Sequence, residues 1–113
     1  MKTRKWDLFW AKVKYEDIED FKIRPVVVIG EEEVLISALK CTSKLNKKFS
    51  YFVKYWEKSG LCKPTAIKID KIIKITKRNL ERKIGRLDPE DIAEIKKLLN
   101  SNLKSNLINK NND

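Results

Sequence analysis

The stretch Arg24-Pro25-Val26-Val27-Val28-Ile29 decides the fold that we expect for this chain. Three valines and an isoleucine in succession favour a β-strand, and the lack of polar alternation indicates that both of its faces are buried. Pro25 has no backbone N–H, so we expect it at the first position of the strand or at a sheet edge. Gly30-Glu31-Glu32 forms a tight connection, which predicts a hairpin with a second strand over residues 33–42.

Alternating patterns predict further strands on both sides of this hairpin. Residues 7–13 (DLFWAKV) place Leu8 and Trp10 on one face of a strand and the residues between them on the other. Residues 65–75 alternate too, but the phase changes at Ile72-Ile73, which indicates a bulge or bend. The other elements that we expect are a loop over 14–22, a basic loop over 43–48, an aromatic-rich strand over 49–55, a turn over 56–61 stopped by Gly60, and a short helical turn within 77–84.

A C-terminal helix follows these strands. Asp88 is a natural N-cap and Pro89 suits the first helical position. One face then carries the apolar stripe Ile92, Ile95, Leu98, Leu99 and Leu103. About five antiparallel strands with one capping helix predict a mainly β fold, a small open barrel. We expect a single domain over residues 1–108 and a polar, disordered tail over 109–113.

Composition limits the classes of function that fit. Among 113 residues the formal net charge is +10, which attracts polyanions. Residues 61–88 hold nine Lys and Arg against three Asp and Glu, a net of +6, whereas residues 89–113 hold four of each. The charge is therefore concentrated before the helix, although a lysine-rich surface without a nucleic-acid role would show the same excess.

Several kinds of site are excluded by what the sequence lacks. There is no histidine, which removes imidazole bases, Ser-His-Asp and Cys-His hydrolases and His-ligated zinc. The two cysteines, Cys41 and Cys62, are too few for a thiolate zinc site or a disulfide scaffold. No phosphate-binding glycine motif, signal peptide or membrane-length apolar run occurs. We expect a cytoplasmic protein without a metal or cofactor.

Four segments, in this order and spacing, resemble the MazF/PemK toxins of bacterial toxin–antitoxin modules. Ile23-Arg24-Pro25 with the valines after it is the most specific, although the glycine that usually leads the family's opening strand is replaced here by Trp6. The four segments are residues 7–13, residues 23–29, Leu39-Lys40-Cys41-Thr42-Ser43, and residues 66–72 together with residues 83–88 before the helix.

The resemblance implies an SH3-like small antiparallel barrel that forms a homodimer. It also implies an endoribonuclease, an mRNA interferase that cleaves single-stranded RNA without a metal ion and leaves 2′,3′-cyclic phosphate and 5′-hydroxyl ends. A further implied partner is a cognate antitoxin, whose acidic, partly disordered segment would block the RNA groove. No contact with a membrane is expected.

Three residues are the catalytic candidates. Arg24 suits stabilisation of the dianionic phosphorane because its planar fork can hold two phosphate oxygens; the alternative is an ion pair with Glu19 or Asp20. Thr42 can donate its hydroxyl to a phosphate oxygen, or simply cap a strand. Asp70, between Lys68 and Lys71, is a candidate base or orienting group, or a member of a surface ion pair. No residue is assigned as the general acid.

The candidates for RNA binding are mainly lysines near these residues. Lysines neutralise phosphates, whereas exposed aromatic rings stack on unpaired bases, although strand aromatics more often lie in the core. The candidates are Lys22, Ser43, Lys44, Lys47, Lys48 and Lys68, with Trp10, Tyr51, Phe52, Tyr55 and Trp56 as the aromatics that stack or pack.

Two other functions remain open on the sequence. One is a basic barrel that binds nucleic acid without cleaving it. The other is a toxin of the same fold that acts on a protein such as a topoisomerase. Arg24 with Thr42 favours cleavage over binding alone, and the basic middle of the chain favours nucleic acid over a protein target.

Overall fold

A computed structural model describes residues 2–14, 21–45 and 49–111. One six-stranded antiparallel sheet, in the order β4-β5-β3-β2-β1-β6, makes up most of this part of the chain. The elements are β1 (Asp7–Lys14), β2 (Phe21–Glu31), β3 (Leu35–Thr42), β4 (Ser50–Phe52), β5 (Ala66–Thr76), the 3₁₀ turn η1 (Lys77–Asn79), β6 (Leu80–Arg86) and α1 (Pro89–Asn111). The predicted fold class, mainly β with one C-terminal helix, is confirmed.

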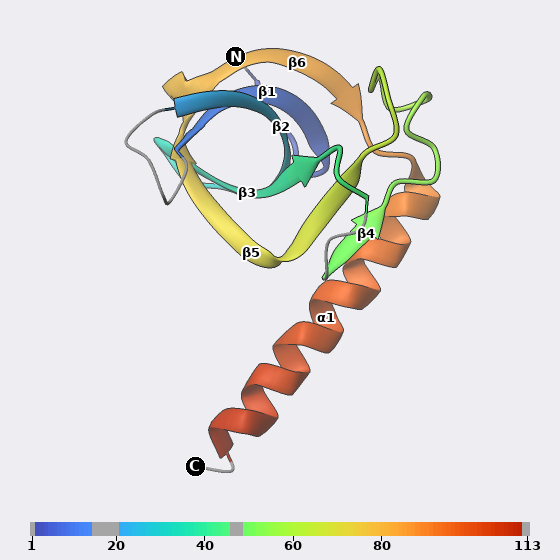
Figure 1. Ribbon diagram of the computed structural model, residues 1–113. Helices are drawn as coiled ribbons and strands as arrows, with labels where there is room; N and C mark the ends of the chain where they lie inside the picture. The colour runs from blue at the N-terminus through green and yellow to red at the C-terminus, as the bar shows by residue number, and fades with distance from the viewer. Residues whose placement is uncertain (1, 15–20, 46–48, 112–113) are drawn as a thin grey trace.

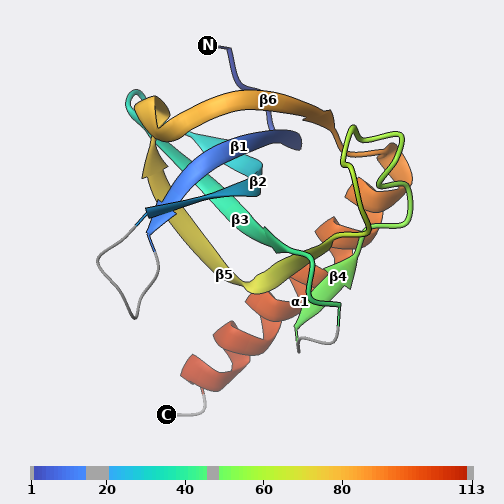
Figure 2. The ribbon, with the colours of Figure 1, turned by 45° about the horizontal axis from the view of Figure 1, so that its top comes forward.

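The sheet curls into an open barrel. Figure 1 shows β1, β2, β3, β5 and β6 curving around a common interior, with α1 crossing outside along β4 and β5. Figure 2 shows the same arrangement from a second direction. In the described part of the chain no ladder joins β6 to β4 or β5, so the barrel is not closed.

The predicted strand at 24–29 is the middle of β2, which is longer than expected. It begins at Phe21 because residues 21–23 pair with Lys14, Val13 and Lys12 of β1. The prediction of a loop over all of 14–22 is therefore wrong, and of the two positions expected for Pro25 the strand start is wrong while the edge position fits. Pro25 lies opposite Trp10 within β2. It is tolerated there because the ladder with β3 begins only at Val26, so the strand has one neighbour at Pro25.

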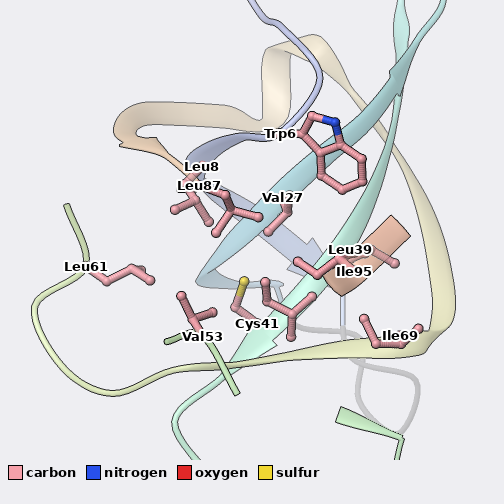
Figure 3. Packing of buried hydrophobic residues seen from close by; sticks show 11 residues of the cluster. Trp6, Leu8, Val27, Leu39, Cys41, Val53, Leu61, Ile69, Leu87 and Ile95 are labelled. Carbon is pink, nitrogen blue, oxygen red and sulfur yellow. The ribbon is translucent and has the colours of Figure 1, made fainter. Parts of the chain in front are cut away.

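The valines of β2 are buried on both faces, as predicted. Val26 and Val28 belong to the core inside the barrel, together with Phe9 and Ala11 of β1. Val27 belongs to a second core between the outer face of the sheet, α1 and the turn after β4. Figure 3 shows Val27, Leu39 and Cys41 of this outer core facing Ile95 of α1 and Leu61 of the turn.

The phase change expected in residues 65–75 is a bulge in β5. Leu39 of β3 lies opposite Ile72, whereas Cys41 lies opposite Ile67, so β5 has extra residues in between. The short helical turn expected within 77–84 is confirmed as η1, but the strand β6 that follows it was not predicted, so the number of strands was underestimated. Its sequence LERKIGR shows little alternation because β6 has a partner only on its β1 side and most of its side chains are exposed.

The strand predicted over 49–55 is also shorter in the structure. β4 ends at Phe52, and the Val53 N–H still donates to the Thr65 carbonyl oxygen at 3.0 Å, but the next two N–H groups donate elsewhere. Those of Lys54 and Tyr55 donate to the Asp91 carboxylate at 2.9 and 3.0 Å. Because one side chain of α1 takes both donors, the backbone leaves the ladder after β4.

Helix α1 begins as predicted. The Asp88 carboxylate accepts a hydrogen bond from the Glu90 N–H at 3.0 Å, which caps the first turn. Of the predicted stripe, Ile95 is fully buried and Ile92 and Leu99 pack on the outer core, whereas Leu98 is exposed. The helix extends to Asn111 and no described helix is long and apolar enough to cross a membrane. The division into a domain over 1–108 and a tail over 109–113 stays a prediction.

Candidate functional site

The register of β2 and β3 brings Arg24 and Thr42 to the same end of the sheet. Val26 lies opposite Lys40 in the ladder. Arg24 and Thr42 each lie two residues beyond that pair, towards the same strand ends and on the same sheet face, because side chains alternate along a strand. Residues eighteen positions apart in the sequence thus lie at the same end and on the same face of the sheet, beyond the last pair of the β2–β3 ladder.

Arg24 presents its guanidinium at this surface. The side chain is exposed, and its Nη1 donates to the carbonyl oxygen of Ile23 at 3.2 Å. This contact uses one of five N–H donors of the fork, and Arg24 has a further interaction besides it. The sequence alternative, an ion pair with Glu19 or Asp20, lies outside the described residues.

Thr42 has the strand-end role that was considered for it, and its hydroxyl stays available as a donor. Its Oγ1 accepts a hydrogen bond from the Lys44 N–H at 3.1 Å, which is the strand-end turn. The hydroxyl proton takes no part in this bond, so the group can still donate to a phosphate oxygen. The turn therefore fixes the hydroxyl at the strand end without consuming its donor.

Lys68 and Asp70 belong to the bulged part of β5. Ile67 and Ile69 point into the outer core, so Lys68, between them, lies on the opposite face. That is the face of Thr42, which lies opposite Ala66. Asp70 continues the same alternation and is exposed, and the described residues give it no ion pair. The surface ion pair considered for Asp70 is therefore not seen with Lys68.

The remaining predicted contacts are distributed around this face. Lys22 is exposed and lies opposite Val13 of β1, two residues before Arg24 and therefore on the same face of β2. Ser43 and Lys44 are exposed in the turn after β3. Lys47 and Lys48 lie outside the described residues.

Among the aromatic candidates, the structure separates Phe52 from the rest. Tyr51 and Trp56 pack on the outer core, and Trp10 and Tyr55 are half-buried. Phe52 is 52% exposed and lies opposite Ala66. It therefore belongs to the cross-strand row Thr42, Ala66, Phe52, at the end of the sheet where Arg24 also lies, and the small Ala66 leaves its ring uncovered. The aromatic pattern of residues 49–55 alone gave no means of choosing among these rings.

The sequence did not point to Asp91, which attaches helix α1 to β4 on the Phe52 side of the site. Asp91 is completely buried and accepts a hydrogen bond from the Tyr51 phenol as well as from the two backbone N–H groups after β4. Burial, and secondly the bond to Asp91, raise the pKa of Tyr51 well above its ordinary value. The sequence position of Asp91, three residues after an N-cap, is typical of a charge at the helix N-terminus and gives no sign of these contacts.

The described residues contain no cluster of three or more His, Cys, Asp or Glu side chains that could hold a metal ion. Cys41 is buried and Cys62 is exposed, and both are free thiols. Burial raises the pKa of the Cys41 thiol to about 12, so it is not a nucleophile near neutral pH.

Comparisons with known proteins agree with this architecture. Residues 4–103 match the sequence profile of the "PemK-like, MazF-like toxin of type II toxin-antitoxin system" family. The Mycobacterium tuberculosis toxin MazF-mt6 is similar in structure, with a TM-score of 0.70 at 17% identity over 87% of this chain and 96% of its own. An endoribonuclease in complex with its cognate antitoxin from Mycobacterial species has a TM-score of 0.69 at 13% identity, over 88% and 91% of the two chains. No curated protein matches in a direct sequence search.

Proposed function

The chain belongs to the family of PemK-like, MazF-like toxins of type II toxin–antitoxin systems, and from that premise we propose that it is a sequence-preferring endoribonuclease of the cytoplasm. Its substrate is single-stranded mRNA, and cleavage needs no metal ion. The observation that carries the proposal is the shared face and strand end of Arg24 and Thr42, given by the register of β2 and β3. An endoribonuclease of the same fold supports it as an analogy.

The reaction is an internal transfer at one phosphate. The ribose 2′-oxygen gives up its proton and attacks the adjacent phosphorus, while the bond from phosphorus to the 5′-oxygen breaks. The departing 5′-oxygen takes a proton. The products are a 2′,3′-cyclic phosphate and a 5′-hydroxyl, and no water or cofactor is consumed.

Arg24 stabilises the charge that develops on the phosphorane. Its guanidinium is permanently charged and binds two oxygens with parallel N–H groups, which a lysine ammonium cannot do. Such preorganised donors are usually the largest single contribution to catalysis of this kind. Arg24 acts as an electrostatic clamp and transfers no proton.

Thr42 and Asp70 assist on either side of the phosphate. The Thr42 hydroxyl, held by the Lys44 N–H, donates to a non-bridging oxygen. Asp70 takes the 2′-proton or orients the group that does, since it is exposed on the same face. We assign no residue to protonation of the 5′-oxygen.

Lysines and one aromatic ring hold the flanking RNA. Phosphates along the site face are contacted by Lys22, Ser43, Lys44 and Lys68, and by Lys47 and Lys48 of the basic loop. Phe52 stacks on an unpaired base. In an antiparallel sheet neighbouring strands are about 4.8 Å apart, so Phe52 is about 10 Å from Thr42 across β5, within reach of an adjacent nucleotide.

The same family premise gives two protein partners. We propose a homodimer with the RNA groove at its surface and a cognate antitoxin that covers the groove with an acidic segment. The net charge of +10 favours an acidic inhibitor, because it competes for the same cations as RNA. Light scattering of the purified chain, alone and with the acidic protein expected from the neighbouring gene, tests both partners.

One experiment tests the activity directly. The purified protein is incubated with single-stranded RNA of varied sequence in excess EDTA, and the product ends are identified by mass spectrometry. We expect cyclic phosphate and 5′-hydroxyl ends at a limited set of sequences. Arg24→Ala should lower the rate by about two orders of magnitude or more, and Arg24→Lys should recover only a small part of it.

A matched control is Arg82→Ala, which removes one exposed arginine of β6 and the same charge. It should cleave at close to the wild-type rate. Intact RNA across all sequences, or cleavage only after a divalent metal is added back, would overturn the proposal. Tight RNA binding without cleavage would favour the non-catalytic nucleic-acid-binding barrel. If RNA is neither bound nor cleaved, the remaining alternative is a toxin that acts on a protein target.

A further inference from the structure

A cavity of about 300 Å³ opens at the mouth of the barrel, beside the proposed cleavage face. It is bounded by the C-terminal end of β1, the start of β2, the end of β5 and the turn η1. The described residues that line it are Lys12, Val13, Lys14, Phe21, Lys40, Ile73, Lys74, Ile75 and Asn79. Its size lies at the lower end of the range for small-ligand sites, enough for one nucleotide.

The described lining of this cavity is basic. Four of the described lining residues are lysines, and none is Asp or Glu. Lys12 and Lys74 form surface ion pairs with Glu81 and Glu32 at 3.7 and 3.4 Å. Lys14 and Lys40 form no ion pair with any acidic group in the described part of the chain, and Lys40 is half-buried. Partial burial of an ammonium group without a partner costs free energy, so Lys40 favours an anionic ligand.

The floor of the cavity is apolar. Val13 and Ile75 belong to the core inside the barrel, and Ile73 packs against that core. Phe21 stands at the rim with 57% of its surface exposed. A cationic rim over an apolar floor with an accessible aromatic ring fits a nucleotide better than it fits a free inorganic anion, since the base covers apolar surface while the phosphate meets the lysines.

The cavity adjoins Arg24 through the sheet register. On the face of β2 that carries Arg24, the flanking residues are Lys22 and Val26. Their strand partners are Val13 on β1 and Lys40 on β3, and both line the cavity. Phe52, in contrast, lies on the β4 side of Arg24 and Thr42. The cavity and Phe52 thus flank the proposed cleavage point from opposite sides.

We propose that this cavity is a second nucleotide subsite. It binds one unpaired nucleotide of the RNA chain next to the cleaved linkage, with its phosphate held by Lys14 and Lys40 and its base against Phe21. The subsite selects for a nucleotide that can leave the base stack, and so contributes to single-strand preference and to sequence choice. The assignment rests on the proposed ribonuclease function for its biological meaning, although binding itself can be measured without cleavage.

The test uses the wild-type chain and two charge-matched double variants. Lys14→Gln/Lys40→Gln changes the cavity, whereas Lys96→Gln/Lys97→Gln removes the same charge from exposed positions on α1. Amide NMR spectra are recorded during titration with uridine 5′-monophosphate, uridine, inorganic phosphate and a glutamate-rich peptide. Affinity for a 2′-deoxy oligonucleotide, which cannot undergo the internal transfer, is measured by fluorescence anisotropy at fixed salt.

We expect the monophosphate to shift the amides of residues 12–14, 21, 40 and 73–79 saturably, with weaker shifts from phosphate and none from uridine. Lys14→Gln/Lys40→Gln should weaken oligonucleotide binding about tenfold relative to the α1 control, as expected for two lost phosphate contacts. Phe21→Leu should weaken the monophosphate but leave inorganic phosphate unchanged.

Three outcomes overturn the subsite. The first is equal oligonucleotide affinity of the two double variants. The second is no saturable shift of the cavity amides with the monophosphate. The third is a shift of those amides by the peptide but not by the monophosphate, which would make the cavity a protein-binding site. Cleavage of RNA by a protein that fails these binding tests would refute the subsite alone. Nucleotide binding in the cavity without cleavage of any RNA would refute the proposed function alone.

Discussion

The phenol of Tyr51 on β4 donates a hydrogen bond to the buried carboxylate of Asp91, forty residues later in the first turn of α1. The same carboxylate accepts the backbone N–H groups of Lys54 and Tyr55. One side chain therefore attaches the helix to β4 and to the turn that follows it. Because Phe52 lies within this segment, Asp91 also fixes the β4 side of the proposed RNA site.

Replacing Asp91 with Asn should destabilise the fold. The amide keeps the shape but offers one acceptor oxygen in place of two, and its NH₂ group would face N–H donors. We expect a loss of about 2–3 kcal/mol in the free energy of unfolding, measured by urea denaturation. Glu90→Gln is the control, because the contacts of the Glu90 carboxylate within the described part of the chain, with Tyr55 and Lys54, are exposed. Equal midpoints for the two variants would contradict this account.

Stability should also fall at alkaline pH because of Tyr51. Burial and the bond to Asp91 raise the pKa of this phenol in the folded state above its ordinary value near 10. The folded protein then keeps a proton that the unfolded chain loses, so the contribution is complete below pH 10 and declines as the pH rises further. The slope for one proton is at most about 1.4 kcal/mol per pH unit.

The measurement is the free energy of unfolding between pH 8 and pH 11 for wild type and Tyr51→Phe. The variant should be less stable at pH 8 and should lose less stability across this range. Parallel curves for the two proteins would show that Tyr51 ionises normally. Tyr55→Phe is the comparison for a tyrosine whose phenol bonds an exposed carboxylate.

The sequence predicted this fold where periodicity and local chemistry agreed. Val26 to Val28 are buried on both faces, Asp88 caps α1, and the phase change at Ile72-Ile73 marks a real bulge. Each of these features depends on residues close together in the chain, so a local pattern is sufficient to find them.

The errors come from contacts across the sheet and between the sheet and α1. Phe21 joins β2 because it pairs with Lys14, and the chain after β4 leaves the ladder because Asp91 takes the N–H groups of Lys54 and Tyr55. For the site, the Arg-Pro motif pointed to Arg24, but only the register of β2, β3, β5 and β4 brings it to the same sheet face and strand end as Thr42 and Phe52. No spacing in the sequence contains that register, because the bulge in β5 shifts it.

Two glycines hold the turn before β5 against β6, and alanine should not fit at either. A Cβ on Gly85 would meet the carbonyl oxygen of Ser59, and one on Gly60, which has a φ of +94°, would meet that of Ile84. Both obstacles are backbone atoms. We expect Gly60→Ala and Gly85→Ala each to cost about 2–4 kcal/mol, seen as lower thermal midpoints.

The matched control for these glycines is Gly30→Ala in β2. The nearest atom to its added Cβ is Cβ of Ser37 at 3.5 Å, an ordinary contact. This variant should differ from wild type by less than about 1 kcal/mol. A Gly85→Ala protein as stable as Gly30→Ala would mean that the turn shifts away without loss.

The two thiols should differ sharply in reactivity. Cys41 is 4% exposed, and burial raises its pKa to about 12, whereas Cys62 is exposed. In the native protein at pH 8, iodoacetamide should modify Cys62 alone, and both thiols only after unfolding in guanidinium chloride. Peptide mass spectrometry distinguishes the two sites, and Cys62→Ser should leave a native protein that takes up no label. Rapid labelling of Cys41 would show that the outer core opens readily.

Phe52 provides a test of the site that does not depend on charge. Its ring is exposed on the face of Thr42, and base stacking on an aromatic ring contributes about 1–3 kcal/mol. Phe52→Leu keeps an apolar side chain but loses the π-face, so KM for an RNA oligonucleotide should rise about tenfold while kcat changes little. Phe52→Trp should keep KM near the wild-type value.

Val34→Ala is the control for a lost apolar surface, since Val34 is 68% exposed in the connection between β2 and β3. A leucine variant with unchanged KM, or one that lowers kcat alone, would remove Phe52 from the RNA path and leave Arg24 and Thr42 as the whole of the site on this side.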